Sequence, residues 1–378
     1  MQLFSLPFVP LKEVLDNLDL NSLLFLSLCS KRTKNFIVQT QKYAFQKIDY
    51  VEYWANAQVV SIKVKTCSGQ PTLMIYLFDT RMFIMEEKFE FIRLNELGTP
   101  IDVFRCPTNP KIRRDLQVKY CSVDASSIID TVLNHLRSLL GNHYKYRVTG
   151  QYPDSTLLPR LGNVEMCHLR VVKNLESTEI DEFLSRSPCL EYCMLMIFND
   201  QKNFTLGESS RLYELDTVHL WTQSVLAQDF MQRFNGRHAF VFGGTVTTTD
   251  VIQFLNAWKS GEKFRNLEVM SVDIALQIPE IRDAVELREV NTEVEYAFVR
   301  KFSERLPYSS FRFSWELRSR FYMVRESDGH VATVKLTRER FFMGVWNMKE
   351  AEYLEKFHDS EDPALGRGGE EAEAADEN

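Results

Sequence analysis

Short β-like runs recur along the middle of the chain at a nearly constant spacing, with helical runs between them. They begin roughly 22 to 28 residues apart, near Gln117, Tyr144, Cys167, Cys193, Thr217, Ala239 and Leu267. Amphipathic segments such as residues 128–133 separate several of them. Such alternation is typical of βα units that build a parallel sheet. The sequence therefore predicts a repeat-like βα sheet over about residues 115–290.

Two of these units share a sequence pattern. Residues 178–184 resemble residues 249–255, and in each unit Ser177, Thr248 or a neighbour is suited to cap the helix. The period is that of leucine-rich repeats, about 20 to 29 residues, although the Asn ladder of those repeats is absent. We expect an irregular leucine-rich-repeat-like sheet, with an ordinary open α/β or α+β sheet as the alternative.

The segments on both sides of this region predict antiparallel strands. On the N-terminal side, residues 59–64, 72–77 and 81–92 are strand-like, and a loop is expected at residues 98–110. On the C-terminal side, a closing hairpin is predicted at about residues 320–346. Its strands, residues 320–324 and 331–336, flank an Asp-Gly turn, and a last strand follows at 341–346. The fold class is mixed, α/β (α+β), with antiparallel hairpins at its ends.

The first 45 residues form a leucine-rich helical block. Pro7 and Pro10 precede a helical pattern whose apolar face consists of Leu11, Val14, Leu15 and Leu18. Residues 19–22 offer N-cap chemistry for a second, almost wholly apolar helix at residues 23–29, and a short third helix is expected after the basic residues 31–34. Three short helices bury little apolar surface by themselves. We expect this block to dock on something else.

The charge balance argues against nucleic acid as a partner. The chain has 45 basic and 52 acidic residues, and the last twenty residues carry eight of the acids and one of the bases, so residues 1–358 have 44 of each. A neutral body lacks the basic excess that phosphate contacts require. The acidic tail, residues 358–378, cannot bury enough apolar surface to fold and is expected to be disordered.

Neither a membrane segment nor a secretory signal is expected. No apolar stretch reaches the 18 or more residues that span a bilayer, and no small-residue cleavage site follows residues 23–29. Seven cysteines at irregular spacings indicate free thiols in a reducing compartment. We therefore expect a cytoplasmic or nuclear protein.

Motifs for catalysis, metal binding or cofactor binding are lacking in the sequence. Phosphate-binding loops, His-Glu-x-x-His and Gly-x-Ser-x-Gly do not occur, and Gly243-Gly244 indicates only a turn. Cys189 and Cys193 have no second ligand pair at zinc spacing. Cys167-His168 are adjacent on a predicted strand and point to opposite faces. We therefore expect a protein without catalytic residues, metal or cofactor.

The N-terminal block resembles an F-box. The family pattern of Leu-Pro, apolar helix positions, Leu-Asp, a Leu-rich helix and a Ser-Lys-Arg step is matched by Leu6-Pro7, Leu11, Val14, Leu15, Leu18-Asp19, Leu23, Leu26, Leu28 and Ser30-Lys31-Arg32. The pattern departs at Val9, where an acidic residue is common, and at Thr33, where Trp is often found.

Residues 215–272 and 325–334 resemble the F-box-associated region of the large nematode-expanded F-box family. The first segment holds a Phe-Leu-x-x-Trp helix at residues 247–261, and the second is similar to the closing hairpin of that family. The resemblance implies an F-box at residues 1–45, an F-box-associated substrate-binding domain at residues 46–357 and a disordered tail.

The resemblance implies a substrate receptor of an SCF-type cullin-RING ubiquitin ligase. The F-box would bind a Skp-type adaptor, and through it the cullin and RING subunits, while the second domain would bind an unknown target protein. The predicted adaptor-binding residues are Leu6, Pro7, Leu11, Val14, Leu15, Leu18, Leu23 and Leu26. Trp221, Arg237 and His238 are unranked candidates for target contact. The alternative is a scaffold protein that keeps the fold without ligase duty, as Val9 and Thr33 suggest.

Overall fold

The computed structural model describes residues 7–79, 90–94, 101–105, 116–120, 125–152, 155–172, 176–198, 204–297 and 316–358. Of these, residues 90–94, 101–105 and 116–120 are described by their backbone alone. The chain divides into two compact units, residues 1–245 and 246–378, and each is described by itself. The predicted acidic tail lies outside the described residues.

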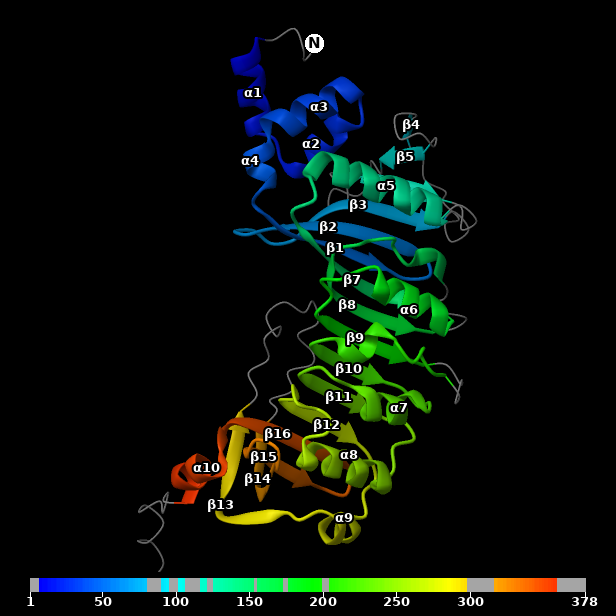
Figure 1. Cartoon of the computed structure of the whole chain (residues 1–378). Helices are drawn as coiled ribbons and strands as arrows, with labels where there is room; N and C mark the ends of the chain where they lie inside the picture. Colours follow the sequence, from blue (N-terminus) through cyan, green and yellow to red (C-terminus); the bar gives the residue numbers. More distant parts are fainter. Residues whose placement is uncertain are drawn as a thin grey trace, which may run out of the picture. The chain divides into compact units, whose positions relative to one another are not determined.

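The first unit begins with the helical block (Figure 1). Its helices are α1 (Phe8–Asp16), α2 (Leu20–Ser27), α3 (Lys31–Thr40) and the short α4 (Lys42–Phe45). The Asp19 carboxylate accepts a hydrogen bond of 2.7 Å from the Ser22 amide at the start of α2, which confirms the predicted N-cap. Ser30 caps α3 through the Thr33 amide in the same way. Helix α4 follows α3 after a single residue and was not predicted.

The helical block packs on helix α5 (Ala125–Leu140) of the same unit. Ser27 Oγ lies 2.8 Å from His135 Nε2, and Lys34 Nζ donates a hydrogen bond of 3.2 Å to Ser138 Oγ. His143 Nε2 lies 2.8 Å from the carbonyl oxygen of Phe45. Burial of the block's apolar core is thus completed within the chain itself, because four short helices have too little interior of their own.

A mixed sheet forms the body of the first unit. Its strand order is β11-β10-β9-β8-β7-β1-β2-β3-β6-β5-β4. The strands are β1 (Ile48–Ala55), β2 (Val59–Thr66), β3 (Thr72–Asp79), β4 (Glu90–Leu94), β5 (Ile101–Arg105), β6 (Leu116–Tyr120), β7 (Lys145–Tyr152), β8 (Val164–Val171), β9 (Tyr192–Ile197), β10 (Thr217–Trp221) and β11 (His238–Phe242). The connections include the 3-10 turns η4 (Ser155–Leu157) and η5 (Arg211–Glu214).

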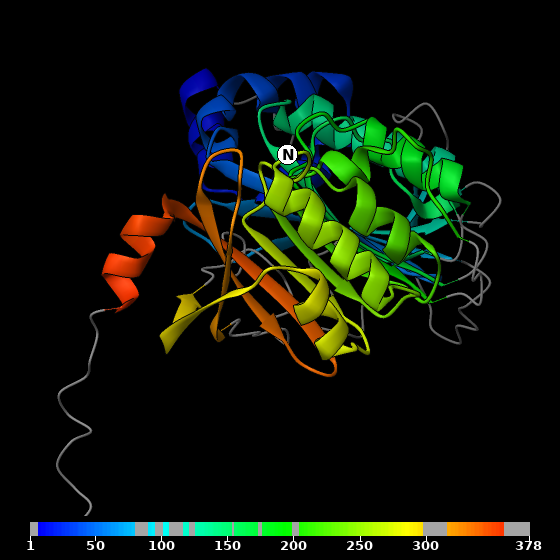
Figure 2. The ribbon, with the colours of Figure 1, turned by 60° about the horizontal axis from the view of Figure 1, so that its bottom comes forward.

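Strands β7 to β11 are parallel and adjacent in chain order. Helices α5, α6 (Ser177–Ser185) and α7 (Leu226–Arg233) lie on the same face of the sheet (Figures 1 and 2). This follows from the right-handed crossover rule, since each connection advances in the same direction. The predicted βα repetition from Tyr144 to Ala239 is therefore confirmed as a parallel sheet, whereas its leucine-rich-repeat character stays a prediction.

Three expectations for the first unit need correction or cannot be assessed. The strand near Gln117 exists as β6, but it pairs with β3 and β5, and the neighbour of β7 on that side is β1. Residues 98–110 were expected to be a loop but contain β5. Most of the predicted strand at 81–92 lies outside the described residues. A local sequence pattern predicts that a strand forms, but it does not predict which strand will pair with it.

The second unit has an antiparallel sheet with the order β13-β14-β15-β16-β12. Its strands are β12 (Val269–Asp273), β13 (Arg288–Ala297), β14 (Glu316–Val324), β15 (His330–Leu336) and β16 (Arg340–Lys349). Its helices are α8 (Thr248–Ser260), α9 (Ile278–Ala284) and α10 (Glu350–His358). The predicted closing hairpin is confirmed by the antiparallel β14–β15 pair, and its final strand by β16.

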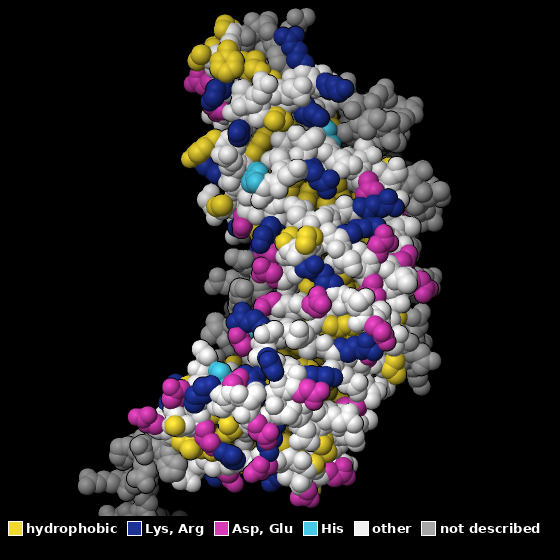
Figure 3. All heavy atoms as spheres, viewed as in Figure 1, with side chains coloured by type: hydrophobic (Ala, Val, Ile, Leu, Met, Phe, Trp, Pro, Cys, Tyr) yellow, Lys and Arg dark blue, Asp and Glu magenta, His cyan; other side chains and the backbone are white. Residues whose placement is uncertain are grey.

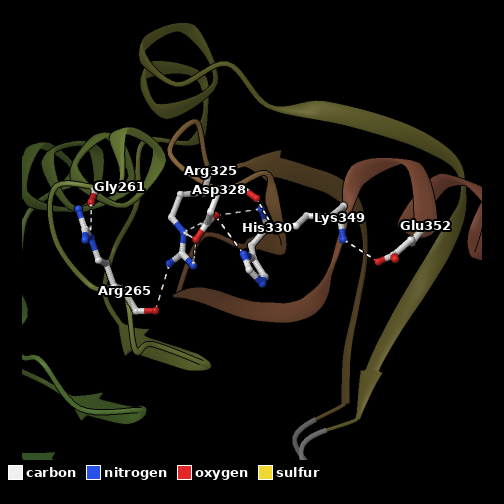
Figure 4. A network of polar contacts seen from close by, with 7 residues as sticks. All are labelled: Gly261, Arg265, Arg325, Asp328, His330, Lys349 and Glu352. Carbon is white, nitrogen blue, oxygen red and sulfur yellow. Dashed lines mark hydrogen bonds and ion pairs between the residues drawn. The ribbon is translucent and has the colours of Figure 1, made fainter.

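A polar network joins the hairpin turn to the end of α8 (Figure 4). The buried Arg325 guanidinium donates hydrogen bonds to both carboxylate oxygens of Asp328 and lies 5.2 Å from the ring centroid of Trp258. The Glu326 amide donates a bond of 2.7 Å to the Lys259 carbonyl. Burial raises the pKa of Asp328, but hydrogen bonds from Arg325 and His330 outweigh burial and hold this pKa below its usual value.

Candidate partner-binding site

Exposed apolar side chains are concentrated in the helical block. Within the described part of the chain, six large hydrophobic residues are exposed, and five of them belong to this block. Their exposed fractions are 61% for Phe8, 71% for Val9, 41% for Val14, 39% for Phe25 and 73% for Tyr43. We call these five residues the apolar patch. A cluster of this kind on a small helical unit marks a partner-binding surface.

The helical period of α1 separates its buried side chains from its exposed ones. Leu11 and Leu15, four residues apart, lie on the same face of the helix and are almost fully buried. Phe8 and Val9 lie in the first turn and are exposed. The Phe8 ring contacts Phe36 of α3 edge-on at 5.9 Å, which orients it while leaving most of its surface exposed.

The predicted adaptor-binding residues fall into three groups. Pro7 and Val14 are exposed, and Leu18 and Leu26 are half-buried. Leu11, Leu15 and Leu23 are core residues with exposed fractions of 3% or less, so they offer no area to a partner without rearrangement. Leu6 lies outside the described residues.

Sequence reasoning missed Phe8, Val9, Phe25 and Tyr43. The prediction rested on which positions the family pattern keeps apolar, and the pattern does not distinguish positions that hold the helices together from positions that face outward. A signal was available for Phe25: residues 23–26 of α2 are four consecutive apolar residues, and they cannot all lie on the single stripe that a packed helix buries.

The charges of the helical block are segregated along the chain. Residues 20–48 contain five basic residues and no acidic one, while the acids of the block, Glu13, Asp16 and Asp19, lie in or just after α1. A hydrogen bond from Lys12, followed by one from Gln41, lowers the pKa of Asp16. Figure 3 shows hydrophobic side chains gathered over α1 and α4 with Lys and Arg side chains between them.

His135 of α5, which contacts Ser27 of the helical block, is a neutral histidine. Burial, followed by the nearby charge of Lys34, lowers the pKa of His135 to about 4. The imidazole that contacts Ser27 is therefore uncharged at neutral pH.

Trp221, Arg237 and His238 do not form a common site. Trp221 ends β10 while His238 begins β11, and in this parallel pair His238 is opposite Thr217, four residues before Trp221. Four residues of strand correspond to about 13 Å. His238 is buried with Nδ1 2.9 Å from Thr217 Oγ1, and Arg237 Nη1 lies 3.6 Å from Asp216 Oδ1.

Cys167 and His168, the adjacent pair considered in the sequence, have side-chain pKa values that are shifted mainly by burial. Burial, followed by a hydrogen bond with Cys193 on the neighbouring strand, raises the pKa of the Cys167 thiol. Burial and then Arg170 lower the pKa of His168 to about 4. Among the described residues, no three His, Cys, Asp or Glu side chains are grouped as a metal site requires. In the same residues, none of the helices is both long and apolar enough to cross a bilayer.

Residues 3–66 match the F-box domain. The matched segment covers the whole helical block and continues through β1 and β2. The chain therefore carries an F-box domain at its N-terminal end, and the apolar patch lies within it. Neither a curated protein nor a solved structure matches the chain.

Proposed function

We propose that this chain is the substrate-recognition subunit of an SCF-type cullin-RING ubiquitin ligase. In this proposal the helical block, residues 1–45, binds a Skp-type adaptor through the apolar patch, and residues 46–357 bind a target protein. The observation that carries it is the position of the patch: five of the six exposed large hydrophobic residues of the described chain lie within the matched F-box segment.

The energetics of the patch fit a partner-binding role. Removing a side chain such as Phe or Val from water contributes about 1.5 to 3 kcal/mol when burial is complete. Leu11, Leu15 and Leu23 then form the platform that keeps the exposed side chains in place. Aromatic side chains such as Phe8, held on one edge by a neighbour, are typical of residues that dominate interface energies.

Ubiquitin transfer in this proposal belongs to the partner subunits. The chain acts by position, because holding a target beside the transfer machinery raises the effective concentration of its lysines. The surroundings of Cys167 and His168 support this division, since a buried thiol with a raised pKa is a poor nucleophile.

The assignment of residues 46–357 to an F-box-associated domain rests on the resemblance of residues 215–272 and 325–334. The helix of the first segment, residues 247–261, touches the second segment in the structure. Arg325 lies against Trp258, and the Glu326 amide bonds the Lys259 carbonyl. A helix and a hairpin that pack together as one element give a physical reason for the two motifs to occur in the same chain.

Co-expression with a Skp-type adaptor, followed by size-exclusion chromatography, tests the proposal. We expect the wild-type chain to co-elute with the adaptor and Phe8→Asp to elute alone, because a carboxylate would enter an apolar contact. Phe198→Asp is the matched control, since Phe198 is the one large exposed hydrophobic residue of the described chain outside the block. Separate elution of a folded wild-type chain would contradict the proposal and favour the scaffold alternative.

A further inference from the structure

Helix α4 presents an aromatic side chain between two lysines. Tyr43 is the most exposed of the large hydrophobic residues in the described chain, at 73%. Lys42 precedes it and is exposed, and Lys47, two residues after the end of α4, places its ammonium 4.6 Å from the Tyr43 ring centroid. Such a ring, held by a cation and otherwise open, offers a partner both apolar area and positive charge.

Helix α4 lies beside the C-terminal end of α1. Gln41, the residue before α4, donates a hydrogen bond of 2.7 Å to Asp16 Oδ1 in the last turn of α1. Figure 1 shows α4 next to α1. Figure 3 shows hydrophobic side chains over both helices on one face.

The two lysines beside Tyr43 lie in a stretch of the sequence that carries only basic charges. Residues 20–48 contain no acid, and within the described part of the chain Lys42 and Lys47 pair with no carboxylate. The nearest acids in the sequence are Asp19 before this stretch and Asp49 after it. Asp16, the acid that approaches α4 in space, already accepts hydrogen bonds from Lys12 and Gln41.

We propose that α4 is a second contact of the adaptor-binding site and that it binds an acidic segment of the adaptor. Tyr43 supplies the apolar contact, and Lys42 and Lys47 bind carboxylates on either side of it. The inference rests on the proposed function, and it adds the chemistry of the partner: an apolar groove for α1 flanked by a cluster of acidic side chains. Charge of this kind acts chiefly on the association rate and on the choice of partner.

The experiment measures adaptor affinity and association rate for the full-length chain at several salt concentrations. The variants are Tyr43→Ser and the double charge reversal Lys42→Glu/Lys47→Glu. The control is Lys263→Glu/Arg338→Glu, which changes the net charge equally at two exposed positions outside the F-box domain. Circular dichroism establishes that each variant is folded, and Lys42→Gln/Lys47→Gln replaces the charge reversal if that variant does not fold.

We expect Tyr43→Ser to weaken binding about tenfold and the charge reversal to slow association at least tenfold at about 0.1 M salt. The difference from wild type should shrink at about 1 M salt, where charges are screened beyond about 3 Å. The control should stay within about twofold of wild type. These results together would support the inference.

Two results would overturn it, and they are distinguishable. If Phe8→Asp abolishes binding while the α4 variants bind like wild type, the proposed function stands and the role of α4 is wrong. If the folded wild-type chain binds no Skp-type adaptor at any salt concentration, the proposed function and this inference both fail.

Discussion

Phe8 and Leu11 lie one helical turn apart in α1, and the structure gives them different roles. Leu11 is buried in the core of the block, whereas Phe8 is mostly exposed although its ring contacts Phe36 of α3. Both are apolar residues in the same helical pattern, so periodicity alone assigns them to the same face. Only the burial of each side chain in the folded chain separates the two roles.

Gly261 is a residue whose replacement should destabilise the second unit. It ends α8 with a left-handed φ of 76°, and a Cβ there would lie 2.0 Å from Ser327 Oγ. We expect Gly261→Ala to lower the free energy of unfolding by about 2 kcal/mol, from backbone strain and the clash combined. Urea denaturation followed by circular dichroism measures the change.

Two variants separate these causes. Gly261→Ala/Ser327→Gly removes the clash, so it should recover part of the loss and leave the cost of the left-handed backbone. Gly162→Ala is the control, because its added Cβ would meet no atom closer than 3.6 Å and its φ is not left-handed. Equal stability of Gly261→Ala and wild type would contradict the close approach of Gly261 to Ser327. Figure 4 shows Gly261 at the end of α8.

At the scale of elements, capping and amphipathic pattern define most helices of the chain. Thr247 and Asp250 form a capping box at the start of α8, as expected for a neighbour of Thr248, and Glu176 with Glu179 does the same for α6. These caps depend on residues close together in the chain, so the sequence pattern predicts them. The attachment of α2 and α3 to α5 joins residues about a hundred positions apart and had no local signal.

That attachment should weaken in mild acid because of His135. Its pKa is about 4 in the folded chain and about 6.5 when unfolded, so the folded state binds fewer protons. The stabilisation from the neutral ring is fully present above pH 6.5 and is lost as the pH falls toward 4. We expect a loss of about 1 kcal/mol between pH 7 and pH 5, after allowance for partial solvent screening.

His135→Gln provides the comparison for this pH dependence. Glutamine can still hydrogen-bond Ser27 but does not titrate, so the variant should lose less stability than wild type over the same range. Urea unfolding at both pH values gives the difference, in which contributions from other groups such as His168 cancel. Identical pH profiles for the two proteins would show that His135 is not buried at this junction.

At the scale of the whole molecule, the net charge of −7 belongs to the last twenty residues, while residues 1–358 are balanced. Net charge far from zero keeps proteins soluble and separate. The tail therefore supplies the repulsion that the body lacks, although it contributes few apolar side chains to any core.

Removal of residues 359–378 should lower solubility near neutral pH without changing adaptor affinity. The shortened chain has no net charge by count of acids and bases, so we expect it to precipitate at lower concentration than the full chain at pH 7 and low salt. Light scattering against concentration measures the first effect, and the adaptor titration measures the second. A loss of adaptor affinity beyond about threefold would mean that the tail takes part in binding.

The sequence by itself determined the elements with local signals. These are the βα alternation from Tyr144 to Ala239, the Asp-Gly hairpin, the Asp19 cap and the helical block that carries the F-box pattern. Each depends on side chains within a few residues of one another, and their spacing is visible in the chain.

Only the tertiary structure decided which strand lies beside β7, which apolar residues of the block are core and which are exposed, and that α4 lies beside the end of α1. These features depend on the area that distant segments bury together. The sequence pattern shows that a residue is apolar, but only tertiary packing determines whether other residues bury its side chain.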